Sequence, residues 1–328
     1  MSIYTFENLP SRTAILNGKE YLFFSGYSYL GMQCVPEFID LINEGIKKYG
    51  WLFPSSRISN TQLSVYKESE DLLSAITGKE DTVIVSNGFT AGKLATKKWK
   101  SEIINLHPSH PAIKRNATTH EQKQKVFAID SCDTLTANIT DFSFSKNDNE
   151  SKIIIVDDSH GFGVLGNNGE GIVSSLPLNI HNEFVISYSL SKAMHVIAGA
   201  ISCTKELATE IRSMPQYTAC TPPSPAMLYA FTKAKHLYTE QLEKLKRNIL
   251  YFESLISEIK GIVYNRQLPV FILPSYIDEK KFAKEEIIIS SFSYPTISGE
   301  KVNRVVLNAL HTKNDLEKLA ETIAGMLK

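Results

Sequence analysis

The sequence has few cysteines, no long apolar run and no excess of charge of either sign. Its four cysteines are Cys34, Cys132, Cys203 and Cys220, and no two of them form a CxxC pair. This spacing disfavours a zinc site and the disulfide framework of a secreted protein, so we expect reduced thiols and no bound metal. The 35 basic and 35 acidic residues give a formal net charge of +0. The balance argues against the basic surface of a nucleic-acid-binding protein or of a protein that binds anionic membranes.

Targeting and membrane signals are also missing from the sequence. The first ten residues, MSIYTFENLP, contain no basic region followed by an apolar core. No apolar run reaches the length that a helix needs to cross a bilayer. We therefore expect a cytoplasmic protein that has no nucleic-acid or membrane partner. Its partners are expected to be small molecules or another copy of itself.

What is present is the pattern of an α/β protein. Apolar residues recur at helical spacing over 36–49 and 65–77, and a short buried strand is predicted over 82–85. Two later apolar runs, over 153–156 and 184–188, are bounded by turn residues. Continuous apolar runs of this length are typical of parallel strands that are covered on both faces.

The length of 328 residues favours one large and one smaller domain. Helical spacing over 225–259 predicts one long helix or two helices that link them. The smaller domain is expected to contain strands over 268–273, 287–292 and 304–308, followed by a helix that begins at Thr312 with Asp315 as its capping partner. We predict an N-terminal arm and helix over 1–45, a large domain over 46–235 and a small α+β domain over 236–328.

Three of the predicted strands end in residues that can carry chemistry, and strand ends in parallel sheets gather ligands. The turn at 87–89, Asn-Gly-Phe, enters a helix whose free N–H groups can hold an anion, although such a turn also occurs for purely structural reasons. The segment 157–160, Asp-Asp-Ser-His, could equally cap a helix or bind a metal. Lys192 follows the third strand, 35 positions after Asp157, and precedes a run of small apolar residues. A desolvated lysine of this kind forms Schiff bases, whereas a lysine taken alone is usually a solvated surface charge.

Together these three strand ends match the needs of one cofactor. Pyridoxal 5′-phosphate requires a lysine for its aldehyde, a carboxylate for its ring nitrogen and an anion site for its phosphate. Lys192, Asp157 and the turn at 87–89 supply one of each. The sequence therefore predicts a pyridoxal-phosphate enzyme with the cofactor in the domain over 46–235.

The same residues resemble a known family, the α-oxoamine synthases of the aspartate-aminotransferase-like fold, over most of the chain. The matching segments are SYLGM at 28–32, SR and NT within 56–61, NGF at 87–89, DDSHG at 157–161, SLSK at 189–192 and the closing GxxRxRxxxxAxHT pattern at 299–312. The resemblance implies a pyridoxal-phosphate-dependent transferase fold: a large domain with a mostly parallel central sheet between helices, and a smaller α+β C-terminal domain. It also implies a homodimer.

The resemblance assigns the catalytic roles residue by residue. Lys192 would bond to the cofactor and later move the proton of the substrate Cα, and Asp157 would pair with the ring nitrogen. His160 would contact the phenolic oxygen. His107 would stack on the ring, with His110 as a competing candidate and an ordinary loop histidine as the alternative for both.

The remaining contacts follow from the resemblance in the same way. Further cofactor contacts are expected from Ser131 on the phenolic oxygen and from the phosphate-binding residues Asn87, Gly88, Phe89 and Ser189. Thr218 would reach the phosphate of the neighbouring subunit, in place of Ala219, where the family usually has a hydroxyl or amide residue. Arg304 would bind the carboxylate of the amino acid, a group that suits a planar bidentate donor. The alternative for Arg304 is a surface ion pair. Tyr27 stands near the same carboxylate, where the family usually has asparagine.

The implied activity joins alanine or glycine to an acyl thioester, carried by CoA or by an acyl carrier protein, with loss of CO2. The DDSHG segment and the compact length favour the member that joins alanine to a pimeloyl thioester in biotin synthesis over the one that joins glycine to acetyl-CoA. An aminotransferase on the same fold is a second hypothesis. A non-catalytic relative is a third, because Tyr27 and Ala219 depart from the family pattern and the segment 107–131 is shorter than usual. Val302 replaces the first arginine of the closing pattern, which bears on the identity of the substrate.

Overall fold

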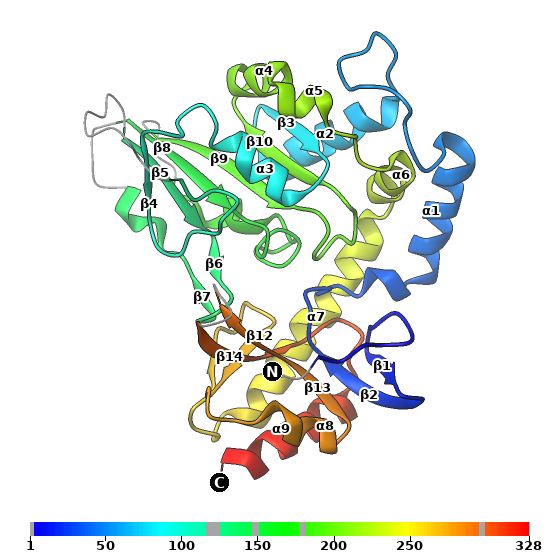
Figure 1. The fold of residues 1–328 in the computed structure, drawn as a ribbon, viewed down its shortest axis with the longest axis vertical. Coiled ribbons are helices and arrows are strands. Elements are labelled where there is room, and N and C mark those ends of the chain that lie inside the picture. Colours follow the sequence, from blue (N-terminus) through cyan, green and yellow to red (C-terminus); the bar gives the residue numbers. More distant parts are fainter. Residues whose placement is uncertain (1–2, 116–124, 146–150, 178–181, 295–298, 328) are drawn as a thin grey trace. The chain divides into compact units, whose positions relative to one another are not determined.

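The computed structural model of the protein describes residues 3–115, 125–145, 151–177, 182–294 and 299–327 (Figure 1). Its contacts divide the chain into two units. The large unit comprises Val35–Cys132 and Ile139–Leu237, and the small unit comprises Met1–Cys34, Asp133–Asn138 and Tyr238–Lys328. The division near residue 237 lies close to the predicted domain boundary at 235. The predicted N-terminal arm over 1–45, in contrast, is shared between the two units.

The large unit is built on a sheet of six strands in the order β3-β10-β9-β8-β5-β4. The strands are β3 (Asp81–Val85), β4 (Ile103–Asn105), β5 (Lys125–Asp130), β8 (Lys152–Asp157), β9 (Asn182–Ser189) and β10 (Gly199–Cys203). Strands β4, β5, β8 and β9 pair in parallel, while β10 is antiparallel to both β9 and β3. Strand β3 therefore runs in the same direction as β9, and five strands have their carboxyl ends on one edge of the sheet. The expected mostly parallel sheet is confirmed.

Helices and short 3-10 turns complete the large unit. They are α1 (Pro36–Tyr49), α2 (Ser64–Thr77), α3 (Gly88–Ala95), η2 (Phe142–Ser145), η3 (Gly171–Ser175), α4 (Lys205–Ser213), α5 (Pro215–Ala219) and α6 (Pro225–Lys233). The helices predicted over 36–49 and 65–77 correspond to α1 and α2. One apolar cluster joins α3 to the sheet, with Ala91 and Leu94 buried among the alternate β3 residues Val83 and Val85. This packing fixes the start of α3 beside the carboxyl end of β3.

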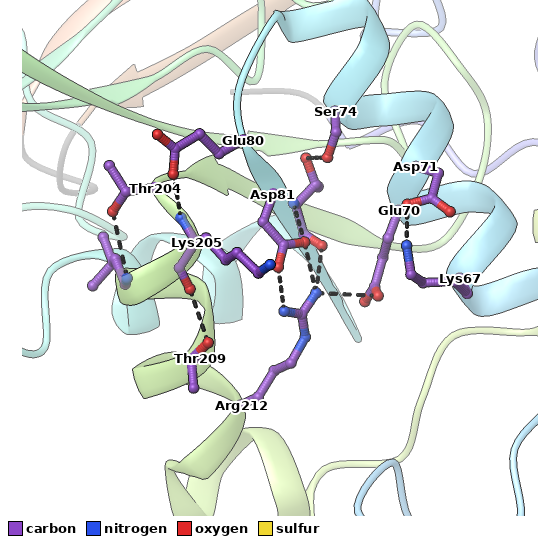
Figure 2. Close-up of polar contacts among 12 residues, drawn as sticks. Lys67, Glu70, Asp71, Ser74, Glu80, Asp81, Thr204, Lys205, Thr209 and Arg212 are labelled. Atoms are coloured by element: carbon purple, nitrogen blue, oxygen red, sulfur yellow. Dashed lines mark hydrogen bonds and ion pairs between the residues drawn. The ribbon is translucent and has the colours of Figure 1, made fainter.

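Polar side chains close the outer edge of the sheet at β3. Glu70 of α2 accepts a hydrogen bond of 3.1 Å from the backbone N–H of Ile84, and Arg212 of α4 donates one of 3.0 Å to the carbonyl of Thr82. Figure 2 shows Arg212 between Glu70 and Asp81, to which it donates at 3.3 Å and 2.6 Å. Unpaired strand edges are prone to pair with other chains, and these contacts occupy the N–H of Ile84 and the carbonyl of Thr82 on the free edge of β3.

The small unit has its own sheet of six strands, in the order β1-β2-β13-β14-β12-β11. Its elements are β1 (Thr13–Leu16), β2 (Lys19–Phe24), η1 (Met32–Cys34), β11 (Val263–Tyr264), β12 (Val270–Leu273), α8 (Glu279–Lys284), β13 (Ile287–Tyr294), β14 (Glu300–Val306) and α9 (Lys313–Leu327). Strands β2 and β13 are parallel and the other pairs are antiparallel. The predicted cap of the last helix is present: Thr312 N donates to Asp315 at 2.7 Å, and Asp315 N donates to the Thr312 hydroxyl at 3.3 Å.

Three further elements, one helix and two short strands, lie where the chain passes from one unit to the other. Helix α7 (Lys235–Ile256) follows α6 directly, so the predicted helical stretch over 225–259 consists of two helices. Strands β6 (Cys132–Asp133) and β7 (Asn138–Ile139) form a separate pair. Most of the polar stretch over 114–125 lies outside the described residues. Within the described ranges, no helix is long and apolar enough to cross a membrane.

Candidate active site

Asp157 is the last residue of β8, and its carboxylate is held in a fixed orientation. The side chain is only 7% exposed, and one of its oxygens accepts a hydrogen bond of 3.0 Å from the N–H of Ser159. The backbone on either side remains paired beyond the strand, because Ser131 N donates to the Asp157 carbonyl and Asp158 N donates to the Ser187 carbonyl. Asp157 is thus a buried carboxylate at the carboxyl edge of the sheet, as predicted for the partner of a ring nitrogen.

Asp158 is buried more deeply than Asp157. Its side chain is fully buried and accepts a hydrogen bond of 2.9 Å from Ile172 N. Glycine is required at 161 and 171, since a Cβ at these positions would lie 2.0 Å and 2.1 Å from the Asp158 oxygens. Burial, together with the charge of Asp157, raises the pKa of Asp158 to about 7. These contacts hold the turn that carries His160, which is half-buried.

Lys192 lies in the connection between β9 and β10 and is half-buried. Two backbone hydrogen bonds close this loop, from Leu190 N to the Ala198 carbonyl at 2.9 Å and from Val196 N to the Leu190 carbonyl at 3.0 Å. Such closure restricts where the lysine stem can point. The electrostatic influence of Lys192 reaches Asp158, whose pKa it acts to lower against the larger effect of burial.

His110 is the histidine that the structure brings to this carboxyl edge. Its Nδ1 lies 3.8 Å from an Asp157 oxygen, and its backbone N–H donates to Asp130 at 2.9 Å. Burial lowers the pKa of His110, and the positive charge of Lys192 lowers it further, against the opposing effect of Asp157. Ala112 N donates to His110 Nδ1 at 3.2 Å, which requires this nitrogen to be unprotonated. The ring is therefore neutral with its proton on Nε2.

His107 is exposed to solvent, and so is about half of the His110 side chain, so exposure does not separate the two histidines. The sequence left the choice between His107 and His110 open, with His107 preferred. Contact with Asp157 and the influence of Lys192 favour His110 as the stacking residue. No periodic pattern predicts how the segment after β4 runs across the strand ends, which is why the choice could not be made from sequence.

The start of α3 and the end of β9 form a cradle for an anion. Asn87 caps the helix, with its side chain accepting a hydrogen bond of 2.8 Å from Thr90 N. Within the described part of the chain, the N–H groups of Gly88 and Phe89 have no partner, as expected at a helix start. A Cβ on Gly88 would lie 2.6 Å from the Cβ of Ser189, so only glycine permits this approach. Four of the five predicted phosphate-binding residues therefore gather here.

Two serines that the sequence reasoning did not select connect the turns of this edge. Ser159 accepts a hydrogen bond of 3.0 Å from Ser189 N. Ser191 lies next to Lys192, and its hydroxyl oxygen is 2.7 Å from that of Ser189, to which Ser191 N also donates at 3.2 Å. Isolated serines give no sequence signal of such a network, although their positions beside Lys192 and within the DDSHG segment could have suggested one.

Two other residues predicted to contact the cofactor, Ser131 and Thr218, have side-chain hydroxyls that bond to neighbouring groups of the chain. Ser131 is fully buried at the end of β5, where its hydroxyl donates to Cys132 Sγ at 3.6 Å. Thr218 lies in α5, and its hydroxyl donates to the Pro215 carbonyl at 3.1 Å. Ser56 donates to the Thr218 carbonyl at 2.8 Å. The roles of Ser131 and Thr218 toward a cofactor remain predictions.

Arg304 belongs to the small unit and is not the surface ion pair considered as its alternative. Its guanidinium donates to Thr134 Oγ1 at 3.0 Å and lies 5.2 Å from the ring centre of Phe292. Its Nε is buried without a hydrogen-bond partner, and no ion pair to Arg304 occurs within the described ranges. Burial lowers the pKa of this guanidinium. An unpaired donor of this kind suits a substrate carboxylate. Tyr27, also in the small unit, is 50% exposed.

The residues of the large unit fit pyridoxal 5′-phosphate. Lys192 offers an amine and Asp157 a buried carboxylate, beside the neutral ring of His110. Gly88 and Phe89 offer unbonded N–H groups next to the hydroxyl of Ser189. Among the described residues, no group of three histidine, cysteine or acidic side chains could hold a metal ion.

Comparisons with known proteins identify the family. The model of the family "Aminotransferase class I and II" matches residues 144–323, more than half of the chain. An 8-amino-7-oxononanoate synthase of Petrotoga mobilis is 25% identical over 97% of this chain and 91% of that protein. A serine palmitoyltransferase of Sphingobacterium spiritivorum is 24% identical over 96% of this chain and 88% of that protein. The solved serine palmitoyltransferase of Sphingomonas wittichii superposes with a TM-score of 0.84 at 17% identity, covering 98% of this chain and 91% of that one.

The chain belongs to the aminotransferase class I and II family, and within that family it is an α-oxoamine synthase. It is an enzyme, and its cofactor is pyridoxal 5′-phosphate. The fold, the family and the cofactor that the sequence predicts are thereby confirmed.

Proposed function

We propose that the enzyme joins alanine to a pimeloyl thioester with release of CO2, the reaction of an 8-amino-7-oxononanoate synthase in biotin biosynthesis. The observation that carries the proposal is the grouping of Asp157, His110 and the Lys192 loop beside the cradle at Gly88. Relatives that bear the synthase name match nearly the whole chain and support the choice of substrates.

In this proposal the chain's own residues do most of the positioning. Bound pyridoxal 5′-phosphate supplies an electron sink for the substrate carbon. Lys192 holds the cofactor and moves the proton of the substrate Cα, while Asp157 keeps the ring nitrogen protonated and His110 lies against the ring. Gly88, Phe89 and Ser189 bind the phosphate, with Asn87 fixing the helix start and Thr218 as a further predicted contact.

Arg304 binds the carboxylate of the amino acid in this proposal, beside Tyr27. Its buried and unpaired Nε supports the assignment, because a desolvated guanidinium without an acidic partner gains most from a carboxylate ligand. His160 and Ser131 contact the phenolic oxygen of the cofactor. Replacement of Arg304 by methionine is expected to raise the KM for the amino acid more than the KM for the thioester.

Release of free thiol from acyl thioesters tests the substrate assignment. We expect release with alanine and pimeloyl-CoA or the corresponding carrier-protein thioester, and none after Lys192→Ala. Turnover with glycine and acetyl-CoA, or with serine and palmitoyl-CoA, would show that the proposed substrates are wrong. It would still agree with an α-oxoamine synthase. If no pair of amino acid and thioester led to release of free thiol, the proposal that the protein is an acyltransferase would be refuted.

Serine palmitoyltransferase is the second candidate activity. It is favoured by the relative of Sphingobacterium spiritivorum and by the structural match to the enzyme of Sphingomonas wittichii. An aminotransferase would instead convert the cofactor to its amine form on addition of an amino donor alone, a lasting change in the visible spectrum. A non-catalytic relative, suggested by Tyr27, Ala219 and the short segment 107–131, would bind the cofactor and respond to no substrate pair.

The working form in this proposal is a cytoplasmic homodimer. The support is the family resemblance, in which the site is completed at the contact between two copies. Sedimentation velocity at micromolar concentration is expected to give twice the mass of 36.7 kDa. A single monomeric species over the whole concentration range would exclude the dimer.

A further inference from the structure

The hydroxyl of Ser189 has two contacts from the same neighbour. Ser191 N donates to Ser189 Oγ at 3.2 Å, and the two hydroxyl oxygens are 2.7 Å apart. Each hydroxyl has one proton, so one serine must donate in the contact between the hydroxyls and the other must accept. The direction of this contact decides where the proton of Ser189 points.

A phosphate group at the α3 cradle would select one of these directions. If Ser189 donates to Ser191, its only proton is used and cannot serve a ligand. If Ser191 donates to Ser189, the Ser189 oxygen accepts from both the N–H and the O–H of Ser191, and its own proton points elsewhere. A phosphate dianion offers only acceptors, so it binds the second arrangement better.

We propose that Ser191 is a positioning residue, which directs the proton of Ser189 toward the phosphate of the cofactor. The inference rests on the proposed function, because it takes the phosphate to lie between Ser189 and the start of α3. The close approach of Gly88 to Ser189, where a Cβ would lie 2.6 Å from the serine Cβ, leaves the hydroxyl beside the unbonded N–H groups of the helix.

The backbone N–H of Ser189 cannot take over this role. It donates to Ser159 Oγ at 3.0 Å, and the Ser159 side chain is only 7% exposed. The hydroxyl is therefore the only donor that Ser189 can offer to a phosphate. Ser191 also precedes Lys192, so the residue that orients the phosphate donor belongs to the same closed loop as the lysine.

The affinity of two cofactor analogues separates the phosphate contribution from the bond to Lys192. 4′-Deoxypyridoxine 5′-phosphate carries the phosphate but no aldehyde, and 4′-deoxypyridoxine lacks both. Each is titrated by equilibrium dialysis into the full-length protein from which the cofactor has been removed. The proteins are the wild type, Ser191→Ala, Ser191→Thr and the control Ser213→Ala, whose hydroxyl donates to the Glu210 carbonyl at the end of α4.

For Ser191→Ala we expect a Kd for the phosphate analogue about fivefold higher than in the wild type, the size of one hydrogen bond, and an unchanged Kd for the analogue without phosphate. Ser191→Thr restores the hydroxyl and should return the Kd to within about twofold. An unchanged Kd for the phosphate analogue in Ser191→Ala, or an equal loss for both analogues, would overturn the proposal.

Failure of the proposed function would look different. In the wild type, borohydride reduction in the presence of pyridoxal 5′-phosphate should label a single peptide that contains Lys192. Absence of this label, or equal binding of the two analogues by the wild type, would refute the cofactor site itself. A labelled Lys192 with an unaffected Ser191→Ala variant would refute only the role of Ser191.

Discussion

Burial shifts the pKa values of two residues, His311 and Asp158, in opposite directions, so they have opposite effects on how stability changes with pH. His311 is 4% exposed, its Nδ1 accepts a hydrogen bond of 3.0 Å from Asn308 N, and its ring stacks on Phe24 at 4.1 Å. Burial lowers the pKa of His311 to about 4. Asp158 is fully buried, and burial raises its pKa to about 7. Their contributions to stability partly cancel in the wild type, so each is visible only through a variant.

His311→Phe is expected to reduce the dependence of the unfolding free energy on pH between pH 6.5 and 4. Between pH 6.5 and 4 the unfolded chain binds a proton at His311 that the folded chain does not, so the wild type loses stability as the pH falls. The difference in unfolding free energy between wild type and variant should therefore shrink by about 3 kcal/mol over this range. Urea unfolding at a series of pH values measures it, with the exposed His236 changed to Phe as the control. Parallel profiles for wild type and variant would contradict this account.

Asp158→Asn should change the profile in the opposite sense. The folded chain keeps a proton on Asp158 that the unfolded chain has lost, so the stability contributed by this group is present below pH 4 and is lost as the pH rises to about 7. Asparagine removes this dependence, and the variant should gain stability relative to the wild type as the pH rises. Asp71→Asn, at an exposed position on α2, serves as the control. A constant difference from pH 4 to 8 would show that Asp158 is ionised throughout.

At the scale of elements, the edge of β3 depends on one buried carboxylate. Glu70 accepts from Ile84 N and pairs with both Arg57 and Arg212, at 3.1 Å and 3.3 Å. Glu70→Ala would leave buried positive charge and an unpaired N–H, so we expect a loss of about 3 to 5 kcal/mol in unfolding free energy. Asp71→Ala, one position further along α2, removes only an exposed pair with Lys67 and should cost less than about 0.5 kcal/mol (Figure 2).

Chemical denaturation of the two variants tests this contrast. Both substitutions remove one acidic residue from the same helix, so they change the net charge equally. Similar losses for both would mean that the buried network contributes no more than a surface pair. A large loss confined to Glu70→Ala, accompanied by aggregation, is the expected result, because the edge of β3 would then be open to other chains.

The close contact between α3 and β9 can be tested at Gly88. A methyl group there would meet the Cβ of Ser189 at 2.6 Å, so Gly88→Ala must displace either the helix start or the serine. We expect at least tenfold weaker binding of pyridoxal 5′-phosphate, about 1.4 kcal/mol or more. Gly325→Ala in α9, where a Cβ meets nothing within 4 Å, is the matched control and should leave binding unchanged. Wild-type affinity in Gly88→Ala would exclude the cradle.

The elements that the sequence predicted well are those whose signals are local. Helix α1 has Pro36 at its start and Gly50 at its end, and the apolar runs of β8 and β9 define buried strands. The last strand was placed over 304–308, whereas β14 covers Glu300–Val306. Its bounds depend on pairing with β13 and β12, which are remote in sequence. The antiparallel placement of β10 depends on long-range pairing in the same way.

The position of a site residue could be predicted from the sequence when that residue lies at or just after the end of a predicted strand. Asp157, Gly88 and Ser189 lie where the sequence placed them because strand direction brings their ends together. His110 was not separable from His107, since a loop path has no periodicity. The unpaired state of Arg304 depends on which side chains surround it, and a single sequence contains no record of that environment.

At the scale of the whole molecule, neither unit is a continuous stretch of chain. The polypeptide passes between the units after Cys34, Cys132, Asn138 and Leu237, and β2 near the amino terminus pairs with β13 near the carboxyl terminus. Strands β1 and β2 therefore have no sheet to join until β13 is made. Cutting the chain at a single point cannot isolate either unit whole.

Because the units are interleaved in the sequence, the large unit can fold before the small one during synthesis on the ribosome. All residues of the large unit have been synthesised once Leu237 is added, so it can fold while translation continues. The first two strands to be made can pair with each other, but their hairpin must wait for 265 further residues (287 minus 22) before Ile287 lies opposite Leu22. A translation arrest between Leu237 and Ile287 would thus yield a polypeptide with a complete anion cradle at the start of α3 and an N-terminal hairpin exposed to chaperones and proteases.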